Sequence, residues 1–239
     1  MSSRVALVTG SARGLGLAVA RALAARGDLV HVVHRTPTPA VAELEREFEG
    51  RAHAADVTDP AGVRALVEGV VERDGRLDVL VHAVGEYAPG PLEGYEHADL
   101  QRMFRSNVES AALLVDAART HLRAARGNAL LFGCSGNDQP RAWRETAVYA
   151  AAKTALLVLV RSWAVEEAPH GVRFNMVSPG HVPHEHAASD TTDPALWGRI
   201  PMGVPGAPSD VAEAALYLTG QGAGYVTGVN LAIAGGWML

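Results

Sequence analysis

The stretch "VALVTGSARGLG" (residues 5–16) joins a short run of aliphatic and β-branched residues to three glycines, Gly10, Gly14 and Gly16. The run predicts a buried strand, and the glycines predict a tight turn into a helix. At such a turn, backbone N–H groups can bind a pyrophosphate, and a Cβ at the glycine positions would block its approach. The spacing is Gly-x3-Gly-x-Gly instead of the Gly-x-Gly-x-x-Gly dinucleotide fingerprint. Because the glycines directly follow an N-terminal strand, they favour nucleotide binding over a turn that is merely glycine-rich.

Six more short apolar runs follow, separated by longer, alanine-rich helical patterns. Strands that alternate with helices predict a single domain over 1–239, an α/β, Rossmann-like, doubly wound sheet of seven parallel strands with helices on both faces. Ligands of such sheets bind beyond the carboxyl ends of the strands. The Pro/Gly-rich segment 179–208 therefore reads as an active-site loop. The six runs are 29–34, 51–56, 79–84, 129–132, 172–177 and 229–234.

Bulk composition excludes several classes of protein. The chain has 239 residues, 48% of them hydrophobic, and a formal net charge of -5 with no basic run, so we expect no nucleic-acid partner. A single cysteine, Cys134, permits no disulfide within the chain. We find no signal peptide and no stretch that approaches the roughly 20 apolar residues of a membrane span. We therefore expect a cytoplasmic protein without membrane contact.

The end of the second predicted strand indicates which dinucleotide binds. Proteins that bind NAD usually place an Asp or Glu there for the adenosine ribose, whereas this chain has His34, Arg35 and Thr36. Arg35, together with Arg13 from the glycine turn, is placed to hold a 2′-phosphate, which favours NADP(H) over NAD. Asp56 ends the third predicted strand and either accepts a hydrogen bond from the adenine amine or serves as a helix cap or turn residue.

Tyr149 and Lys153 lie four residues apart in a long helical pattern, which puts them on one face. A free phenol has a pKa near 10, and bringing it close to 7 needs about 4 kcal/mol of differential stabilisation. An adjacent ammonium and an oxidised nicotinamide can supply this in a partly desolvated cleft. Tyr149 is then a usable proton donor.

The ordered set of motifs resembles the classical short-chain dehydrogenase/reductase family over essentially the whole chain. The resemblance implies hydride transfer between C4 of a nicotinamide and a carbonyl or alcohol. It implies that Tyr149 is the general acid/base, that Lys153 binds the nicotinamide ribose, that Asn107 holds a proton-relay water and that a serine polarises the carbonyl. The motifs are "TGSARGLG" (9–16), "DV" (56–57), "HAVG" (82–85), "SN" (106–107), Ser135, "YAAAK" (149–153), "PG" (179–180) and "YVTG…GGW" near the end.

Together these arguments give a set of expected cofactor-binding residues, drawn from the glycine turn, the strand ends and the helix with Tyr149. The set is Gly10, Arg13, Gly14, Leu15, Gly16, His34, Arg35, Thr36, Asp56, Val57, Ala83, Gly85, Tyr149, Lys153, Pro179, Gly180 and Val182.

Two departures from the family pattern stand out. The usual Asn-Asn-Ala-Gly is here His82-Ala83-Val84-Gly85, which removes any contact made by the two Asn side chains. The catalytic serine usually lies 13 residues before the tyrosine, but Ser135 lies 14 and Cys134 lies 15 before Tyr149. Counted from the start of the fifth strand, Cys134 takes the serine position. We favour Ser135, because a hydroxyl donates to a carbonyl oxygen far better than a thiol does.

The segment 180–205 occupies the substrate loop of the family. We expect Tyr87, His181 and Trp197 to line the substrate pocket, with simple packing of loop aromatics as the other interpretation. His181, His184 and His186 do not predict a metal site, because the loop is irregular and the family needs no metal.

Three functions remain open at this point. The first is NADPH-dependent reduction of a small-molecule ketone, as in enzymes resembling 3-oxoacyl-acyl-carrier-protein reductases or polyketide ketoreductases. The second is pteridine reduction, suggested by Tyr87, although pteridine reductases replace the middle glycine of the loop, here Gly14, by Arg. The third is a sensor that binds NADP without chemistry, which would not need Ser135, Asn107, Tyr149 and Lys153 together.

The helix that contains Tyr149 is apolar over nearly its whole circumference, so one face covers the sheet while the other still needs burial. In the family, this helix and the one with Asn107 pair with their copies about a two-fold axis. We therefore expect a homodimer or homotetramer.

Overall fold

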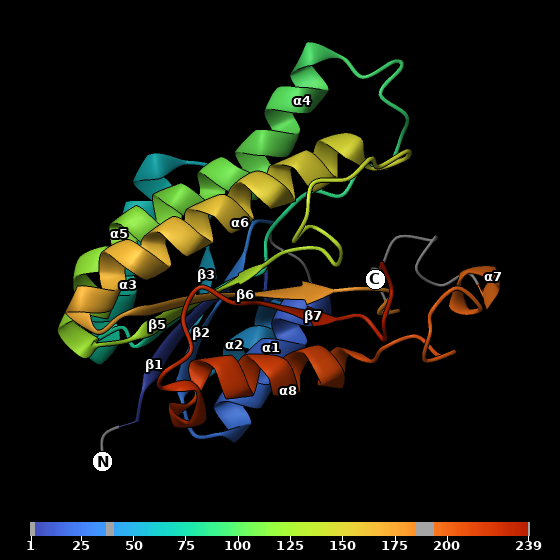
Figure 1. Cartoon of the computed structure of the whole chain (residues 1–239). Coiled ribbons are helices and arrows are strands. Elements are labelled where there is room, and N and C mark those ends of the chain that lie inside the picture. Colours follow the sequence, from blue (N-terminus) through green and yellow to red (C-terminus); the bar gives the residue numbers. More distant parts are fainter. Residues whose placement is uncertain (1–2, 37–40, 185–193, 239) are drawn as a thin grey trace.

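The computed structural model describes residues 3–36, 41–184 and 194–238, and these form strands and helices in alternation (Figure 1). In chain order the elements are β1 (Val5–Thr9), α1 (Gly14–Ala25), β2 (Leu29–His34), α2 (Val41–Glu47), β3 (Ala52–Ala54), α3 (Pro60–Asp74), β4 (Val79–His82), α4 (His97–Phe104), the π-helical turn η1 (Arg105–Glu109), α5 (Ser110–Ala125), β5 (Asn128–Phe132), α6 (Ala147–Glu167), the 3-10 turn η2 (Ala168–His170), β6 (Arg173–Pro179), α7 (Pro194–Trp197), α8 (Pro208–Thr219), the 3-10 turn η4 (Gln221–Ala223) and β7 (Asn230–Ile233).

The seven strands form one parallel sheet in the order β3-β2-β1-β4-β5-β6-β7, as the sequence predicts. The order reverses between β1 and β4, which is where doubly wound sheets bind their ligands. The third strand is shorter than the predicted run 51–56 because β3 is an edge strand that pairs only with β2.

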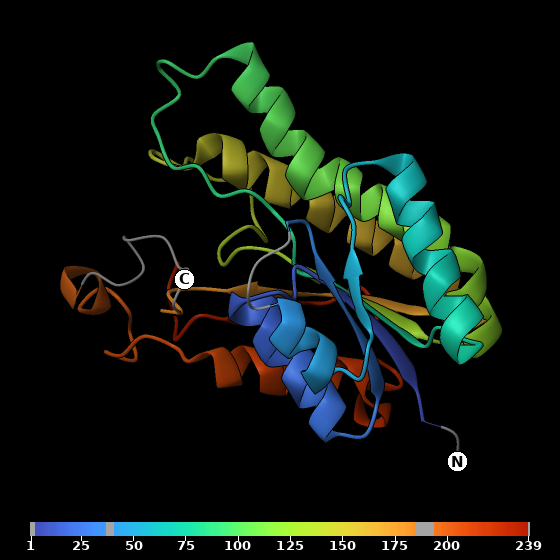
Figure 2. The same cartoon turned by 180° about the vertical axis from the view of Figure 1, so that it is seen from behind.

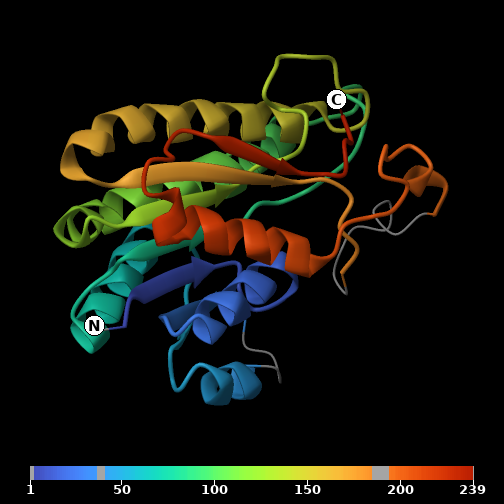
Figure 3. The same cartoon turned by 60° about the horizontal axis from the view of Figure 1, so that its bottom comes forward.

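Helices cover both faces of the sheet. α3, α5 and α6 lie on one face, and α1, α2 and α8 lie on the other (Figures 1 and 2). Successive residues of a strand alternate between the two apolar layers. On β5, Leu130 packs in the layer with α1 and α8, and Leu131 packs in the layer with α5 and α6. α7 stands outside these layers, on the side where the strands end (Figure 3).

α6 continues through η2, and the stretch Ala147–His170 is long and apolar enough to cross a membrane by length and composition. The expectation that no segment reaches this length was therefore wrong. Half of this stretch's 18-residue apolar window is buried inside the protein, and Trp163 packs against Phe174 of β6 with ring centroids 5.8 Å apart. This burial is what a core helix of a globular fold requires.

The outer face of α6 carries apolar side chains that the rest of the described chain leaves uncovered. Val158 is 60% exposed and Val165 is 76% exposed. The two residues are seven positions apart, which is about two helical turns, so they lie on the same side of the helix. On its inner side, α6 is tied to α5 by the buried carboxylate of Glu167, which accepts from Arg119 and Arg123. The two helices therefore present one rigid surface.

Candidate active site

Tyr149 and Lys153 lie one turn apart near the start of α6, as predicted. The Lys153 Nζ atom is 5.8 Å from the centroid of the Tyr149 ring and donates to the carbonyl oxygen of Phe132 at 2.7 Å. Lys153 is only 3% exposed. Because Phe132 ends β5, this bond fixes the ammonium at the carboxyl edge of the sheet.

Asn107 lies on the π-helical turn η1 and comes to the same place. Its amide nitrogen donates to the carbonyl oxygens of Glu86 at 3.0 Å and Met103 at 3.1 Å. Its Oδ1 is buried and has no hydrogen-bond partner within the described ranges. A Cβ on Gly85 would collide with this Oδ1 and would lie 2.9 Å from Lys153 Nζ. A glycine at position 85 thus lets the amide oxygen and the ammonium converge on one spot.

Burial controls the ionisation of Tyr149 and Lys153. It raises the pKa of the Tyr149 phenol, and the Cys134 thiol and the Tyr87 hydroxyl add to this rise. It lowers the pKa of Lys153 to about 8. The sequence argument expects the ammonium and an oxidised nicotinamide together to lower the pKa of Tyr149, which stays a prediction, whereas in the protein alone desolvation of the phenolate is the largest cause and raises it. Tyr149 is therefore protonated, which is the form that a proton donor needs.

Cys134 and Ser135 both lie in a buried loop after β5, 8% and 6% exposed. The chain continues the β5 pairing past Phe132, with the Gly133 N–H on the Val177 oxygen at 2.8 Å and the Ser135 N–H on the Pro179 oxygen at 3.4 Å. Burial raises the pKa of Cys134 to about 11, with Lys153 acting in the opposite direction. The thiol in turn raises the pKa values of Tyr149 and Lys153, so it lies near both side chains.

The loop after Ser135 is held by amides that the sequence analysis did not single out. Asn137 is buried and donates to the carbonyl oxygen of Lys153 at 3.1 Å, and it accepts from the Asn230 amide of β7 at 2.9 Å. These bonds join the loop to α6 and to the edge of the sheet. No motif signals them, since their partners lie far away along the chain.

His82, the first residue of the departure from Asn-Asn-Ala-Gly, is a buried link between three elements. Its Nδ1 lies 2.8 Å from the Thr9 hydroxyl of β1, and its Nε2 lies 3.1 Å from the Ser110 hydroxyl of α5. Burial, followed by repulsion from Lys153, lowers the pKa of His82 to about 3, so the ring is neutral. With the proton on Nε2, Thr9 donates to His82, His82 donates to Ser110, and Ser110 donates to the Ser106 oxygen at 2.7 Å.

This chain of bonds ends beside Asn107. The Ser106 hydroxyl accepts from the Asn107 amide at 3.1 Å and from the Glu86 N–H at 3.2 Å. His82 therefore supports the π-helical turn that carries Asn107 and is a positioning residue. Active sites often contain such turns.

Replacing His82 by leucine should lower the free energy of unfolding by about 2 kcal/mol, since it removes two buried hydrogen bonds, one to the Thr9 hydroxyl and one to the Ser110 hydroxyl. His82→Asn keeps a polar side chain and should lose clearly less. Urea denaturation at fixed protein concentration measures both, with His97→Leu at an exposed histidine as the control. A His82→Leu protein as stable as the control would show that the link carries no energy.

The glycine turn between β1 and α1 forms a cradle that side chains would fill. Gly10 has a φ of 72°, and a Cβ there would lie 2.6 Å from the Ala83 oxygen. Gly14 has a φ of 59°, and a Cβ there would lie 3.1 Å from the ring of His184. A Cβ on Gly16 would collide with the Gly10 oxygen. Three glycines are required, and the open backbone at the start of α1 fits the pyrophosphate of a dinucleotide.

The predicted adenosine end of the site lies at the ends of β2 and β3. Arg13, Arg35 and Thr36 are exposed, and in the ranges that the structure describes neither arginine has an ion pair. His34 is buried, and its Nδ1 has no partner there. Both bonds that the Asp56 carboxylate accepts come from Thr58, at 2.9 and 2.7 Å, so its Oδ1 stabilises a turn.

The other predicted cofactor positions have structural roles at the same edge. The Gly180 N–H pairs with the Ile233 oxygen at 2.9 Å, directly after Pro179. Asp59, not Asp56, caps α3. Val57 and Val182 are buried, and Leu15 and Ala83 pack against the layer that contains α1 and α8.

The three predicted substrate residues reach different places. Tyr87 meets Tyr149 edge-on with ring centroids 5.0 Å apart, so it lies at the reacting group. His181 contacts Trp237 edge-on at 4.3 Å, and the Arg199 guanidinium lies 4.9 Å from the Trp237 ring. The buried Nε1 of Trp197 has no partner within 3–36, 41–184 and 194–238. Trp237 was not predicted, and His186 lies outside these ranges.

Metal ligation finds no support in the described part of the chain, where no group of three His, Cys, Asp or Glu side chains is placed to hold an ion.

Known proteins share both the sequence and the fold of this chain. The family model described as "Enoyl-(Acyl carrier protein) reductase" matches residues 10–238. L-fucose dehydrogenase of Mus musculus is 32% identical, over 98% of this chain and 88% of its own. A blue fluorescent protein from a metagenomic library, solved in complex with NADPH, is 31% identical with a TM-score of 0.91, over 99% and 98% of the two chains. An NADH-dependent reductase responsible for alginate metabolism is 29% identical with a TM-score of 0.88, over 98% and 97%.

These likenesses span nearly the whole chain and agree with the glycine cradle and the Tyr149–Lys153 pair on α6. The protein is therefore an oxidoreductase that belongs to the classical short-chain dehydrogenase/reductase family.

Proposed function

We propose that this protein is an NADPH-dependent reductase that converts the carbonyl group of a small molecule into an alcohol. The observation that carries the proposal is the convergence of Asn107 and Lys153 on Gly85, beside a protonated Tyr149 at the carboxyl edge of the sheet. A sensor that only binds NADP would not need this arrangement.

In the reaction we propose, the nicotinamide, when bound, supplies a hydride to the carbonyl carbon. Tyr149 gives its phenolic proton to the carbonyl oxygen, so the substrate gains two electrons and two hydrogens and becomes an alcohol. Ser135 donates a hydrogen bond to the same oxygen as its charge develops. Lys153, whose pKa of about 8 leaves it mostly charged at neutral pH, stabilises the phenolate that remains. Asn107 holds the water through which Tyr149 regains its proton.

The choice of NADPH rests on Arg13 and Arg35. Both are exposed at the edge that would face the adenosine ribose. Arg35 follows β2 at the position where NAD-binding proteins usually have an acidic side chain. A 2′-phosphate is the anion that two such guanidinium groups suit best. The NADPH complex of the metagenomic relative supports this preference, and the NADH-dependent relative represents the alternative.

Arg35→Ala should weaken NADPH binding by about 1.5 to 3 kcal/mol, the range for a hydrogen bond to a charged group, and leave NADH binding nearly unchanged. Titration of cofactor fluorescence gives both affinities, with Arg64→Ala, an exposed arginine on α3, as the control. Equal losses for both cofactors would mean that Arg35 supports the fold instead of the phosphate.

Tyr87 also bears on pteridine reduction, because an aromatic side chain can stack on a flat heterocycle. The cradle argues against that alternative, since Gly14 keeps the φ and the close packing that a side chain would disturb. An assay of NADPH oxidation with ketones, quinones and dihydrobiopterin separates the two. Turnover of dihydrobiopterin alone would overturn the ketone assignment.

Self-association through α5 and α6 completes the proposal. A two-fold contact would cover Val158 and Val165, so we expect a homodimer or homotetramer by light scattering at micromolar concentration. Val158→Glu with Val165→Glu should shift the protein toward the monomer, whereas Leu92→Glu, at a site that is also exposed, should not. A wild-type protein that scatters only as a 25.1 kDa monomer would contradict this.

A further inference from the structure

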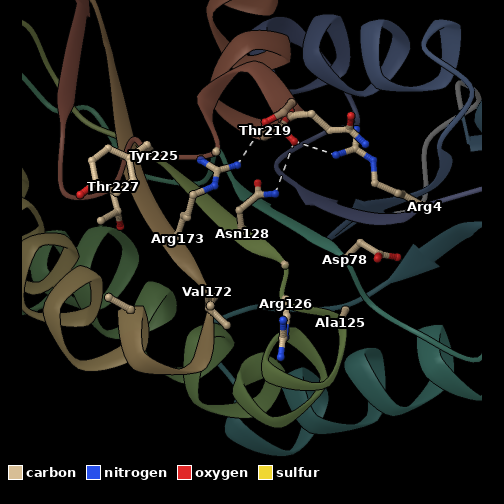
Figure 4. Close-up of a pocket in the computed structure, with 16 residues that line it drawn as sticks. Arg4, Asp78, Ala125, Arg126, Asn128, Val172, Arg173, Thr219, Tyr225 and Thr227 are labelled. Atoms are coloured by element: carbon tan, nitrogen blue, oxygen red, sulfur yellow. Dashed lines mark hydrogen bonds between the residues drawn. The ribbon is translucent and has the colours of Figure 1, made fainter.

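A cavity of about 620 Å³ lies at the amino edge of the sheet, opposite the edge that carries Tyr149 (Figure 4). Two of the arginines that line it already have partners: Arg4 pairs with Asp28 at 3.4 Å, and Arg173 donates to backbone carbonyl oxygens. Figure 4 shows Arg126 apart from both. Among the described residues, the charged groups of this lining therefore do not converge on a ligand.

A different cluster of titratable side chains joins β2, the edge strand β3 and the end of α3. His31 of β2 is fully buried, its Nε2 lies 2.7 Å from the Asp74 carboxylate, and its Nδ1 lies 2.7 Å from the Nε2 of His53 on β3. Arg51, directly before β3, donates to both oxygens of Asp74 at 2.8 and 3.1 Å. The proposed reaction does not use this continuous chain of bonds.

β3 depends on these side chains for its attachment. It is an edge strand of three residues that pairs only with β2, and none of the three is fully buried, so apolar packing alone holds it weakly. Arg51 and His53 supply further attachment. The Ala55 N–H donates to the His34 oxygen at 3.0 Å, directly before Arg35. A loosened β3 would therefore also loosen the end of β2 at the predicted adenosine site.

The bonds of the cluster fix where its protons lie. The Arg51 guanidinium lowers the pKa of Asp74 to about 2, so the carboxylate only accepts, and the Nε2 of His31 must carry a proton. The Nδ1 of the neutral His31 ring then accepts from the Nε2 of His53. If both rings were charged, two N–H groups would face each other at this 2.7 Å contact. The bonded pair therefore cannot hold an added proton on each ring.

The surroundings also oppose protonation of the two rings. Burial lowers the pKa of His31 to about 4 against the opposing bond to Asp74, and burial lowers the pKa of His53 as well. Among the neighbouring groups, the carboxylates favour the charged rings and the cations and the third imidazole oppose them. These groups are Asp74 and Arg73 of α3, Arg51 before β3, Glu45 of α2 and His34 of β2.

The direction of the resulting pH dependence follows from linkage. In the unfolded chain both imidazoles have pKa values near 6.5. Because the folded protein holds the pKa of His31 at about 4, the unfolded chain binds more protons between about pH 6.5 and pH 4. The stabilisation that the cluster gives is complete above this window and is lost as the pH falls through it.

We propose that the cluster of His31, His53, Asp74 and Arg51 is a pH-sensitive latch for the edge strand. It holds β3 against β2 and α3 while both imidazoles are neutral, and it loosens β3 as they take up protons in acid. The latch acts at the edge of the sheet, apart from the carbonyl chemistry at α6.

Hydrogen exchange measured by mass spectrometry tests the latch. The readout is the protection of peptides that cover β3, corrected for the intrinsic exchange rate at each pH. From pH 7 to pH 5 this protection should fall at least about tenfold, because opening the strand exposes imidazoles that then bind protons. Wild-type protection of β3 that is the same at both pH values would overturn the proposal.

Variants assign the fall to the cluster. His31→Gln keeps an N–H for Asp74 without titrating, and His31→Leu fills the site without a polar group. Both should lose most of the fall, whereas His97→Leu, at an exposed histidine, should keep it. Because the change with pH is compared within each variant, a lower absolute protection does not affect the result. A fall as steep as that of the wild type in both His31 variants would also overturn the proposal.

Discussion

Replacing Tyr149 by phenylalanine should reduce turnover at least about 100-fold while NADPH still binds. The change removes the phenolic oxygen and keeps the ring, so the packing against Tyr87 is preserved. The size of the loss is typical for removal of a general acid. Steady-state rates give turnover, and fluorescence titration gives cofactor affinity in the same preparation.

Tyr217→Phe is the matched control, because it makes the same change at an exposed position on α8. The pH profile adds a second readout: the wild-type rate should fall once the phenol or Lys153 loses its proton, and the residual rate of Tyr149→Phe should lack the phenol-dependent limb. A Tyr149→Phe protein with normal turnover would exclude Tyr149 as the proton donor.

Ser135→Ala should lower turnover by about 100-fold, the scale for loss of one donor to a developing oxyanion. Cys134→Ala should cost little beyond a slight loss of stability. The reason is the weakness of a thiol as a donor, which burial does not change, since the raised pKa of Cys134 keeps it as the neutral thiol.

The reverse result has a clear meaning. If Cys134→Ala abolishes reduction and Ser135→Ala retains it, the count from β5 is the correct one and the extra residues lie in the loop "GNDQPRAWRETA" (136–147). The Cys134→Ser variant then gives a direct comparison, because a hydroxyl in the thiol position should raise the rate above that of the wild type.

The sheet was predictable because parallel strands covered on both faces must be apolar throughout. All seven runs contain strands in the structure; the edge strand β3 is half as long as predicted, and β4 and β7 are each two residues shorter. The glycine cradle was predictable for a similar reason: positive φ at Gly10 and Gly14 and close approach at Gly16 leave no room for another residue.

The support of the site was not predictable from the sequence. His82 bonds to Thr9 and Ser110, which lie 73 and 28 residues away along the chain, so its role depends on how β1, β4 and α5 pack. The sequence displays nearby charges but not burial, and burial raises the pKa of Tyr149 in the protein alone. The lower pKa expected with an oxidised nicotinamide bound stays a prediction. The choice between Cys134 and Ser135 depends on side-chain direction in a loop, which spacing alone does not fix.

The central claim is that this protein transfers a hydride from NADPH to a carbonyl carbon. Mass spectrometry of the product formed from NADPH deuterated on the transferred position of C4, with the ketone that the assay panel identifies, tests it most directly. The account predicts an alcohol that carries one deuterium on the former carbonyl carbon, formed by the wild type and nearly absent with Tyr149→Phe. An unlabelled alcohol, or labelled alcohol formed equally fast by Tyr149→Phe, would contradict it.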